Sequence, residues 1–160
     1  MTAISFKSVH GPSSFTTDAD AMAAALAMAK VAFVEGDLAI AAMVLDSSGR
    51  VLSARHDEVR SASSPTAHAV VLALKDAARQ MVGWRLIDTT LVVTREPCAL
   101  CAGAAVAARV RRVVFAGPDD QLGCLGSRYN FGVDPRLNHE FAIVSGLEAG
   151  IATLLFEQSR

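Results

Sequence analysis

The sequence contains few cysteines, no long apolar run and no excess of charge of either sign. Its three cysteines, Cys98, Cys101 and Cys124, are too few and too unevenly spaced for a disulfide scaffold. No apolar stretch approaches the roughly 18 residues of a membrane-spanning helix, and residues 1–12 lack the layout of a signal peptide. The formal net charge of -1 excludes a strongly basic protein that binds mainly through phosphate contacts. We therefore expect a cytoplasmic protein with no membrane segment.

The sequence does contain enough apolar material for a folded core. Hydrophobic residues make up 52% of the 160 residues and charged residues 19%, which excludes general disorder. Residues 1–15 are polar and irregular. We therefore predict an N-terminal extension over residues 1–15 and a single domain over residues 16–160.

Hydrophobic periodicity predicts an alternation of helices and strands. Helices are expected over residues 18–34, 65–81, 98–109 and 147–158, and strands over residues 38–45, 51–55, 89–94, 113–116 and 141–144. Pro65 and Pro97 each open a helix, because proline fits the first helical turn. Trp84 is expected to pack in the core. This order of elements predicts an α/β fold around a mixed sheet.

Two short segments carry the candidate chemistry. Cys98 and Cys101 follow Pro97 and lie one helical turn apart, so that two thiolates can hold a soft divalent ion. His68 occupies the same kind of position behind Pro65. Taken singly, a Cys-x-x-Cys pair or a helical histidine is common without a metal. Taken together, two such helix starts predict one imidazole and two thiolates around a zinc ion, with the fourth position left open as in catalytic sites.

The sequence resembles the cytidine-deaminase-type zinc hydrolases, which share a His-x-Glu … Pro-Cys-x-x-Cys pattern. It resembles in particular the bacterial tRNA adenosine deaminases that act on the anticodon wobble base, over residues 18–156. The matching stretches follow one another in the same order at residues 65–69, 84–86, 96–103, 108–115, 125–127 and 137–139. The resemblance implies a three-layer α/β/α cytidine-deaminase-like fold with a mixed five-stranded sheet. It also implies Zn²⁺ as the cofactor and His68, Cys98 and Cys101 as its ligands.

One departure from the family pattern bears on the mechanism. Two residues after the histidine ligand, the family has a glutamate that takes a proton from the zinc-bound water and delivers it to the substrate. This sequence has Val70 there, which cannot move a proton. General acid–base catalysis contributes roughly 10²–10⁴-fold to a rate. Val70 also continues the apolar stripe of its helix, and both interpretations can hold. We expect a protein that is catalytically silent or strongly impaired.

Four positions are candidates for substrate binding: Asp57, Ala67, Glu96 and Pro97. Asp57 stands where the family usually has an asparagine that hydrogen-bonds the nucleoside. An aspartate accepts but cannot donate a hydrogen bond. It is either a relocated proton shuttle or a solvated loop carboxylate beside Glu58.

Three further features have weaker patterns. Cys124 is either a fourth metal ligand or a spare thiol. The loop over residues 117–136, with Tyr129 and Phe131, is expected to roof the substrate pocket, as loops in this position do in the family. His139 is expected to have a structural role.

Three functions remain open from the sequence. The first is a non-catalytic zinc-binding subunit that forms a homodimer, or a heterodimer with an active deaminase homologue, in tRNA processing. The resemblance supplies a precedent, because the non-catalytic subunit of the eukaryotic heterodimeric enzyme also has valine at this position. The second is an active hydrolytic deaminase of a small base, nucleoside or metabolite that uses Asp57, Glu58 or a group of the substrate as the acid. The third is a structural module held by zinc. The net charge of -1 predicts modest affinity for tRNA.

Overall fold

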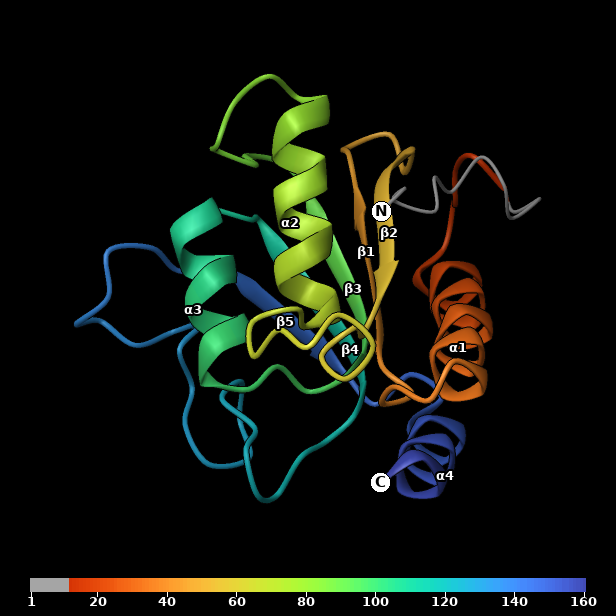
Figure 1. The fold of residues 1–160 in the computed structure, drawn as a ribbon. Coiled ribbons are helices and arrows are strands. Elements are labelled where there is room, and N and C mark those ends of the chain that lie inside the picture. Colours follow the sequence, from red (N-terminus) through yellow and green to blue (C-terminus); the bar gives the residue numbers. More distant parts are fainter. Residues whose placement is uncertain (1–11) are drawn as a thin grey trace.

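The computed structural model describes residues 12–160, which form four helices and five strands (Figure 1). The elements are α1 (Asp18–Val34), β1 (Ala41–Leu45), β2 (Val51–His56), α2 (Ala69–Gln80), β3 (Thr90–Arg95), α3 (Ala99–Ala108), β4 (Arg112–Gly117), β5 (Ala142–Ser145) and α4 (Ala149–Ser159). None of these helices has the length and hydropathy needed to cross a lipid bilayer.

The five strands form one mixed sheet in the order β2-β1-β3-β4-β5. Strand β1 is antiparallel to both of its neighbours, whereas β3, β4 and β5 run parallel to one another. The antiparallel pair arises because a tight turn, closed by a 3.0 Å hydrogen bond from Gly49 to Asp46, joins β1 to β2. Helix α3 provides the crossover that brings β4 parallel to β3. The predicted mixed five-stranded sheet is confirmed.

The helices form two outer layers around the sheet. Figure 1 shows α2 and α3 on one face and α1 and α4 on the other. One core cluster joins α2 and α3 to the sheet, and a second joins α1 and α4 to its opposite face. Strand β1 is buried along its whole length, as expected for an apolar strand covered on both faces. The predicted three-layer α/β/α arrangement is confirmed.

Of the predicted N-terminal extension, residues 1–15, the first eleven residues lie outside the described part of the chain. The remaining residues, 12–15, are held against the β1–β2 turn. The backbone N–H of Phe15 donates to the carbonyl of Gly49 at 2.9 Å, and that of Val51 donates to the carbonyl of Ser13 at 2.9 Å. The Phe15 side chain is buried among residues of α1 and the sheet.

The predicted starts of one strand and one helix are wrong, because local turns precede the regular structure in both places. Strand β1 begins at Ala41 rather than at residue 38, because the N–H of Ile40 donates to the carbonyl of Leu38 at 2.7 Å and closes a tight turn. Helix α2 begins at Ala69 rather than at Pro65. Successive turns occupy residues 58–67, and Pro65 lies within them.

Trp84 was expected in the core, and that prediction is wrong. Its side chain is 58% exposed, in the segment between α2 and β3. The guanidinium of Arg85 lies 4.6 Å from the centre of the indole ring. The ring therefore keeps an exposed cation–π contact instead of a place in the core.

Candidate metal centre and substrate cavity

The centre is built where two helices begin. His68 is the N-cap residue of α2 and Cys98 the N-cap residue of α3, both with extended backbone conformations. Each residue thus stands one position before its helix, rather than inside the first turn as predicted. Neither side chain caps its own helix by a hydrogen bond, so imidazole and thiol are free to face each other. Cys101 lies in the first turn of α3 and is 4% exposed.

The three side chains are spaced as zinc ligands are. His68 Nδ1 lies 3.5 Å from Cys101 Sγ and 3.8 Å from Cys98 Sγ. All three ligand atoms lie within 4.8 Å of one another. Tetrahedral zinc with Zn–N and Zn–S bonds of about 2.0–2.3 Å sets its nitrogen and sulfur ligands about 3.6 Å apart. The residues present therefore fit the ion in both chemistry and spacing.

The three groups shift one another's protonation. The hydrogen bond with Cys101 lowers the pKa of Cys98 to about 4, against the opposing effect of burial. The hydrogen bond with Cys98, together with burial, raises the pKa of Cys101. The hydrogen bond with Cys98 also raises the pKa of His68. Without a metal ion, these shifts favour a thiolate at Cys98 and a neutral thiol at Cys101. Both thiols must be deprotonated to bind zinc, so a bound divalent cation would stabilise the second thiolate as well.

A cavity of about 160 Å³ adjoins the cluster and is lined by His68, Cys98 and Cys101. It is small beside the roughly 300–1,000 Å³ of pockets that take drug-sized ligands. Val70, on the first turn of α2, also lines it and is only 1% exposed. At the position where the family pattern has a carboxylate, the wall of this cavity is therefore apolar.

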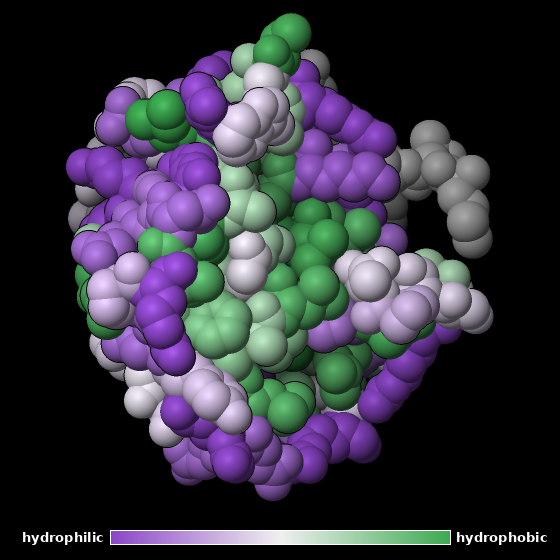
Figure 2. Space-filling model, turned by 90° about the vertical axis from the view of Figure 1, so that its left-hand side faces the viewer, coloured by the Kyte–Doolittle hydropathy of each residue, from purple (hydrophilic) through white to green (hydrophobic). Residues whose placement is uncertain are grey.

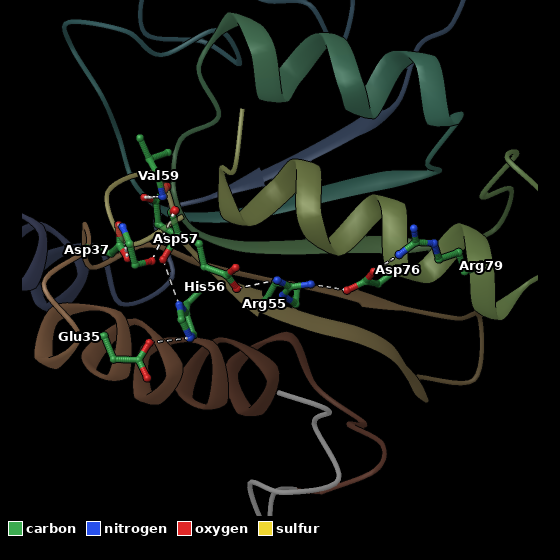
Figure 3. Close-up of polar contacts among 10 residues, drawn as sticks. Glu35, Asp37, Arg55, His56, Asp57, Val59, Asp76 and Arg79 are labelled. Carbon is green, nitrogen blue, oxygen red and sulfur yellow. Dashed lines mark hydrogen bonds and ion pairs between the residues drawn. The ribbon is translucent and has the colours of Figure 1, made fainter. Parts of the chain in front are cut away.

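Asp57 brings a buried carboxylate to the same cavity, from the loop that follows β2. The residue is 1% exposed, and its Oδ1 atom accepts a hydrogen bond from the N–H of Val59 at 3.2 Å. Figure 3 shows this contact and, at a separate place, the ion pair of Arg55 with Asp76. Burial raises the pKa of Asp57, although the bond from Val59 and the nearby His68 oppose that shift. Within residues 12–160, this one bond is the only hydrogen bond that the carboxylate accepts.

Glu96 also lines the cavity, but its two oxygens are occupied. Oε1 accepts from the N–H groups of Leu125 at 2.9 Å and Ser127 at 3.0 Å. Oε2 accepts from the N–H of Asp119 at 2.9 Å and from the Ser127 hydroxyl. Burial alone would raise the pKa of Glu96, but these hydrogen bonds lower it below its usual value. Gly123 is required for this arrangement, because a Cβ atom there would meet the carboxylate.

The other predicted site residues fall in different places. Pro97 lines the cavity, whereas Ala67 is buried and is not among the lining residues. Cys124 is buried, outside the metal cluster, and its Sγ donates to the carbonyl of Leu122 at 3.4 Å. His139 Nε2 lies 2.7 Å from the carbonyl oxygen of Val110.

The loop after β4 contributes to the cavity through residues that the sequence did not single out. Asp119 and Leu122 line it, whereas Tyr129 is 61% exposed and Phe131 packs against the core. The loop therefore borders the cavity as expected, but through Asp119 and Leu122 rather than through Tyr129 and Phe131.

Among the other lining residues that were missed, one is charged and one is aromatic. Arg95 ends β3, and Phe156 comes from α4. A charged residue two positions beyond the buried Val93 was a detectable signal for Arg95, because alternate residues of a strand share one face. No sequence signal was available for Phe156, since its place depends on how α4 packs.

Comparison with known proteins identifies the family. Residues 15–117 match the cytidine and deoxycytidylate deaminase zinc-binding region. The chain belongs to this family of zinc-binding deaminases. It is 36% identical to the tRNA-specific adenosine deaminase of Haemophilus influenzae over 132 residues, which cover 82% of this chain and 76% of that one. It is 38% identical to the tRNA-specific adenosine deaminase of Bacillus subtilis over 132 residues, covering 82% and 81%.

Solved structures of this deaminase family agree with the fold. A structure from a study of tRNA:A34 deaminases has a TM-score of 0.80 at 30% identity, covering 84% of this chain and 96% of that chain. Guanine deaminase from Nitrosomonas europaea has a TM-score of 0.78 at 22% identity, covering 99% and 93%, and at that identity it shows the fold alone. The predicted deaminase-like fold and zinc cofactor are confirmed, and the three side chains of the cluster are positioned to bind the metal ion.

Proposed function

We propose that this chain is a zinc-binding, tRNA adenosine deaminase-like protein that is catalytically silent or strongly impaired by itself and acts as the partner subunit of an active deaminase. His68, Cys98 and Cys101 would hold the ion. The observation that carries the proposal is Val70, an uncharged and 1% exposed residue of the cavity wall two positions beyond His68. The family pattern has its proton-transferring glutamate at this position.

Two other carboxylates of the cavity wall, those of Glu96 and Asp119, support impairment. Zinc, when bound, supplies an acidified water as the nucleophile. A deaminase must also carry a proton to the leaving amine. The hydrogen bonds that hold Glu96 lower its pKa. Asp119 is held by Arg95 at 3.0 Å and by the N–H groups of Gln121 and Leu122, both at 3.0 Å. Both groups are fixed in structural hydrogen bonds, which disfavours their protonated forms.

The surface supports a partner. Figure 2 shows apolar side chains gathered through the middle of the face seen from the side of α3, with polar margins around them. Helix α3 consists almost entirely of small apolar residues, and Leu100 at its start is 41% exposed. An apolar face of this kind marks an interaction surface. A homodimer, or a heterodimer with an active homologue, would cover it.

The names of the relatives support RNA as the substrate of the assembly, because two of them are tRNA-specific adenosine deaminases. The cysteines are free thiols, and zinc binding needs them reduced. We therefore propose that the protein works in the cytoplasm. We also propose that residues 16–160 act as one domain.

The deciding experiment measures ammonia release by the zinc-loaded chain and by its Val70→Glu variant. The substrates are adenine, guanine, cytosine, their nucleosides and an anticodon stem-loop RNA. Val70→Gln is the matched control, because glutamine has the size of glutamate without its proton transfer. We expect turnover from Val70→Glu alone. Turnover by the chain as given would overturn the proposal of silence.

The partner role has its own test. The chain is co-expressed with a catalytically complete tRNA adenosine deaminase of the same cell, and the purified product is analysed by light scattering. We expect a mixed dimer that deaminates the stem-loop RNA. If no mixed dimer forms and the chain remains a monomer, the result would contradict a subunit role.

A second candidate function rests on Asp57. Its carboxylate lines the cavity, has a raised pKa, and accepts one hydrogen bond among the described residues. These properties suit a relocated acid in an active deaminase of a small base, nucleoside or metabolite.

The remaining alternative, a module in which zinc only holds the fold, predicts that neither Val70→Glu nor the chain as given releases ammonia.

A further inference from the structure

The cavity wall contains a guanidinium, that of Arg95, most of whose N–H donors have no hydrogen-bond partner within residues 12–160. Arg95 follows Val93 by two positions on β3, so both side chains lie on the sheet face that borders the cavity. The side chain of Arg95 is only 12% exposed. A largely buried charge at the wall of a small cavity requires an explanation, because such groups are normally fully paired.

The contacts of Arg95 fix its orientation but use few of its donors. Nε donates to Oδ2 of Asp119 at 3.0 Å. The guanidinium carbon lies 3.7 Å from the centre of the Phe156 ring, which comes from α4. Within residues 12–160, the bond to Asp119 is the only hydrogen bond that the guanidinium donates. A guanidinium carries five N–H groups, so both terminal NH₂ groups remain available.

Asp119 holds this arrangement rigidly. Its other oxygen, Oδ1, accepts from the N–H groups of Gln121 and Leu122, both at 3.0 Å. Arg95 is therefore clamped between a fixed carboxylate and an aromatic ring, and both of these neighbours also line the cavity. A donor pair held this way is preorganised, which reduces the entropy cost of binding an acceptor.

The charges around the cavity select the kind of acceptor. Asp119 already balances Arg95, and the buried carboxylate of Asp57 adds a further negative group. A phosphate or carboxylate ligand would be repelled by these groups, because both carboxylates are largely buried. A neutral carbonyl oxygen next to a ring nitrogen can accept from a guanidinium without that repulsion, as the O6 and N7 atoms of guanine do.

We propose that Arg95 is a specificity-determining residue whose free NH₂ groups bind the ring carbonyl of a neutral heterocyclic base, so that the cavity prefers oxo-substituted bases over bases that lack the carbonyl. This preference rests on the proposed function only in taking the cavity as a site for a base. It holds whether the chain is silent or active, because it concerns binding. The cavity volume of about 160 Å³ suits a single base.

The test compares ligands that differ by the ring carbonyl and the neighbouring ring N–H that accompanies it. Cytosine and 4-aminopyrimidine form one pair, and hypoxanthine and purine form another. Their binding to the zinc-loaded chain is measured by calorimetry. We expect the oxo member of at least one pair to bind roughly 10- to 100-fold more tightly, the range given by a well-placed bidentate contact. Equal affinity within both pairs, or no binding of any base, would overturn the proposal.

The Arg95→Met variant separates recognition from structural support. Methionine keeps an unbranched apolar stem against Phe156 but donates no hydrogen bond. We expect the preference for the carbonyl to disappear, while binding of 4-aminopyrimidine or purine and the zinc content stay unchanged. Arg95→Lys keeps the charge and should restore part of the preference. If Arg95→Met weakens both members of a pair equally, Arg95 is only structural and the proposal is wrong.

These results are independent of the proposal of silence. Ammonia release by the chain as given would overturn silence and leave the carbonyl preference intact. Absence of that preference would overturn the role of Arg95 and leave silence intact.

Discussion

The Nδ1 atom of His68 lies 3.5 Å from the Sγ atom of Cys101, across the junction between the starts of α2 and α3. This contact joins two segments that are 33 positions apart in sequence. A metal ion at this point would tie both helix starts together. Metal binding should therefore be coupled to folding, because such a ligand set is not preformed in the unfolded chain.

The first prediction concerns the ligand set. Cys98→Ser should weaken zinc binding by more than about 100-fold, since even the loss of an outer hydrogen-bond partner of a ligand costs about 10–100-fold. The melting temperature should fall with it. The measurements are zinc content after dialysis and thermal unfolding. Cys124→Ser is the control and should retain its zinc, because Cys124 lies outside the cluster. Full zinc occupancy in Cys98→Ser would refute the assignment.

The second prediction concerns removal of zinc with a chelator at pH 6. Cys98, with a pKa of about 4, should then be a thiolate, whereas burial raises the pKa of Cys124 above its ordinary value. Alkylation by iodoacetamide should therefore modify Cys98 first, at least about tenfold faster, because the thiolate is the reactive form. Because a lowered pKa keeps the thiol ionised above that value, labelling should slow only as the pH falls through about 4. Peptide mass spectrometry measures the rates, and zinc-loaded protein should be protected. Equal labelling of Cys98 and Cys124 would contradict the prediction.

The third prediction concerns the loop that Glu96 holds. Glu96→Gln removes a charged acceptor of four hydrogen bonds and places an NH₂ group against N–H donors. The free energy of unfolding should fall by about 1.5–3 kcal/mol, the range for hydrogen bonds to a charged group. Urea unfolding measures this loss, and limited proteolysis should show faster cleavage within residues 118–127. The control is Glu148→Gln, because the side chain of Glu148 makes no capping hydrogen bond. An unchanged stability of Glu96→Gln would show that the hydrogen bonds around Glu96 contribute little.

The sequence was sufficient for the architecture because hydrophobic periodicity reports burial. The apolar run over residues 38–45 predicted a strand covered on both faces, and the β-rich residues 89–94 predicted a further strand; β1 is buried throughout and β3 along all but its last residue. Helix starts were harder to locate. Pro65 is compatible with a first helical turn, yet a turn closed by Ala67 and Ser64 takes precedence, and His68 becomes the N-cap instead. Proline fits both structures equally, so local sequence could not decide between them.

The cysteine pair of the metal cluster was accessible from sequence because its spacing is local, and His68 was indicated by the family pattern, whereas part of the cavity wall was not accessible. Cys98 and Cys101 are separated by one turn of helix. Arg95 and Phe156 meet only because α4 packs against β3 and β4, and no periodicity reports that contact. Glu96 was predicted as a substrate-binding residue, but the partners that occupy its carboxylate lie 23 to 31 positions away, on a loop without regular structure.

The last prediction concerns Asp57 and separates a silent protein from a slow one. If the chain as given is silent, Asp57→Asn should leave ammonia release at the background of the zinc-loaded protein, because no proton passes through this carboxylate. If Asp57 is a relocated acid, the same substitution should reduce a measurable rate by roughly 10²–10⁴-fold, the usual contribution of a general acid or base. Asparagine keeps the size of the side chain and its oxygen can still accept from the N–H of Val59, so the loop should remain in place. Asp76→Asn, which changes a carboxylate that pairs with Arg55 outside the cavity, controls for unspecific loss of charge. A rate that falls in Asp57→Asn but not in Asp76→Asn would replace the silent subunit with an active deaminase whose acid has moved from the helix to the loop.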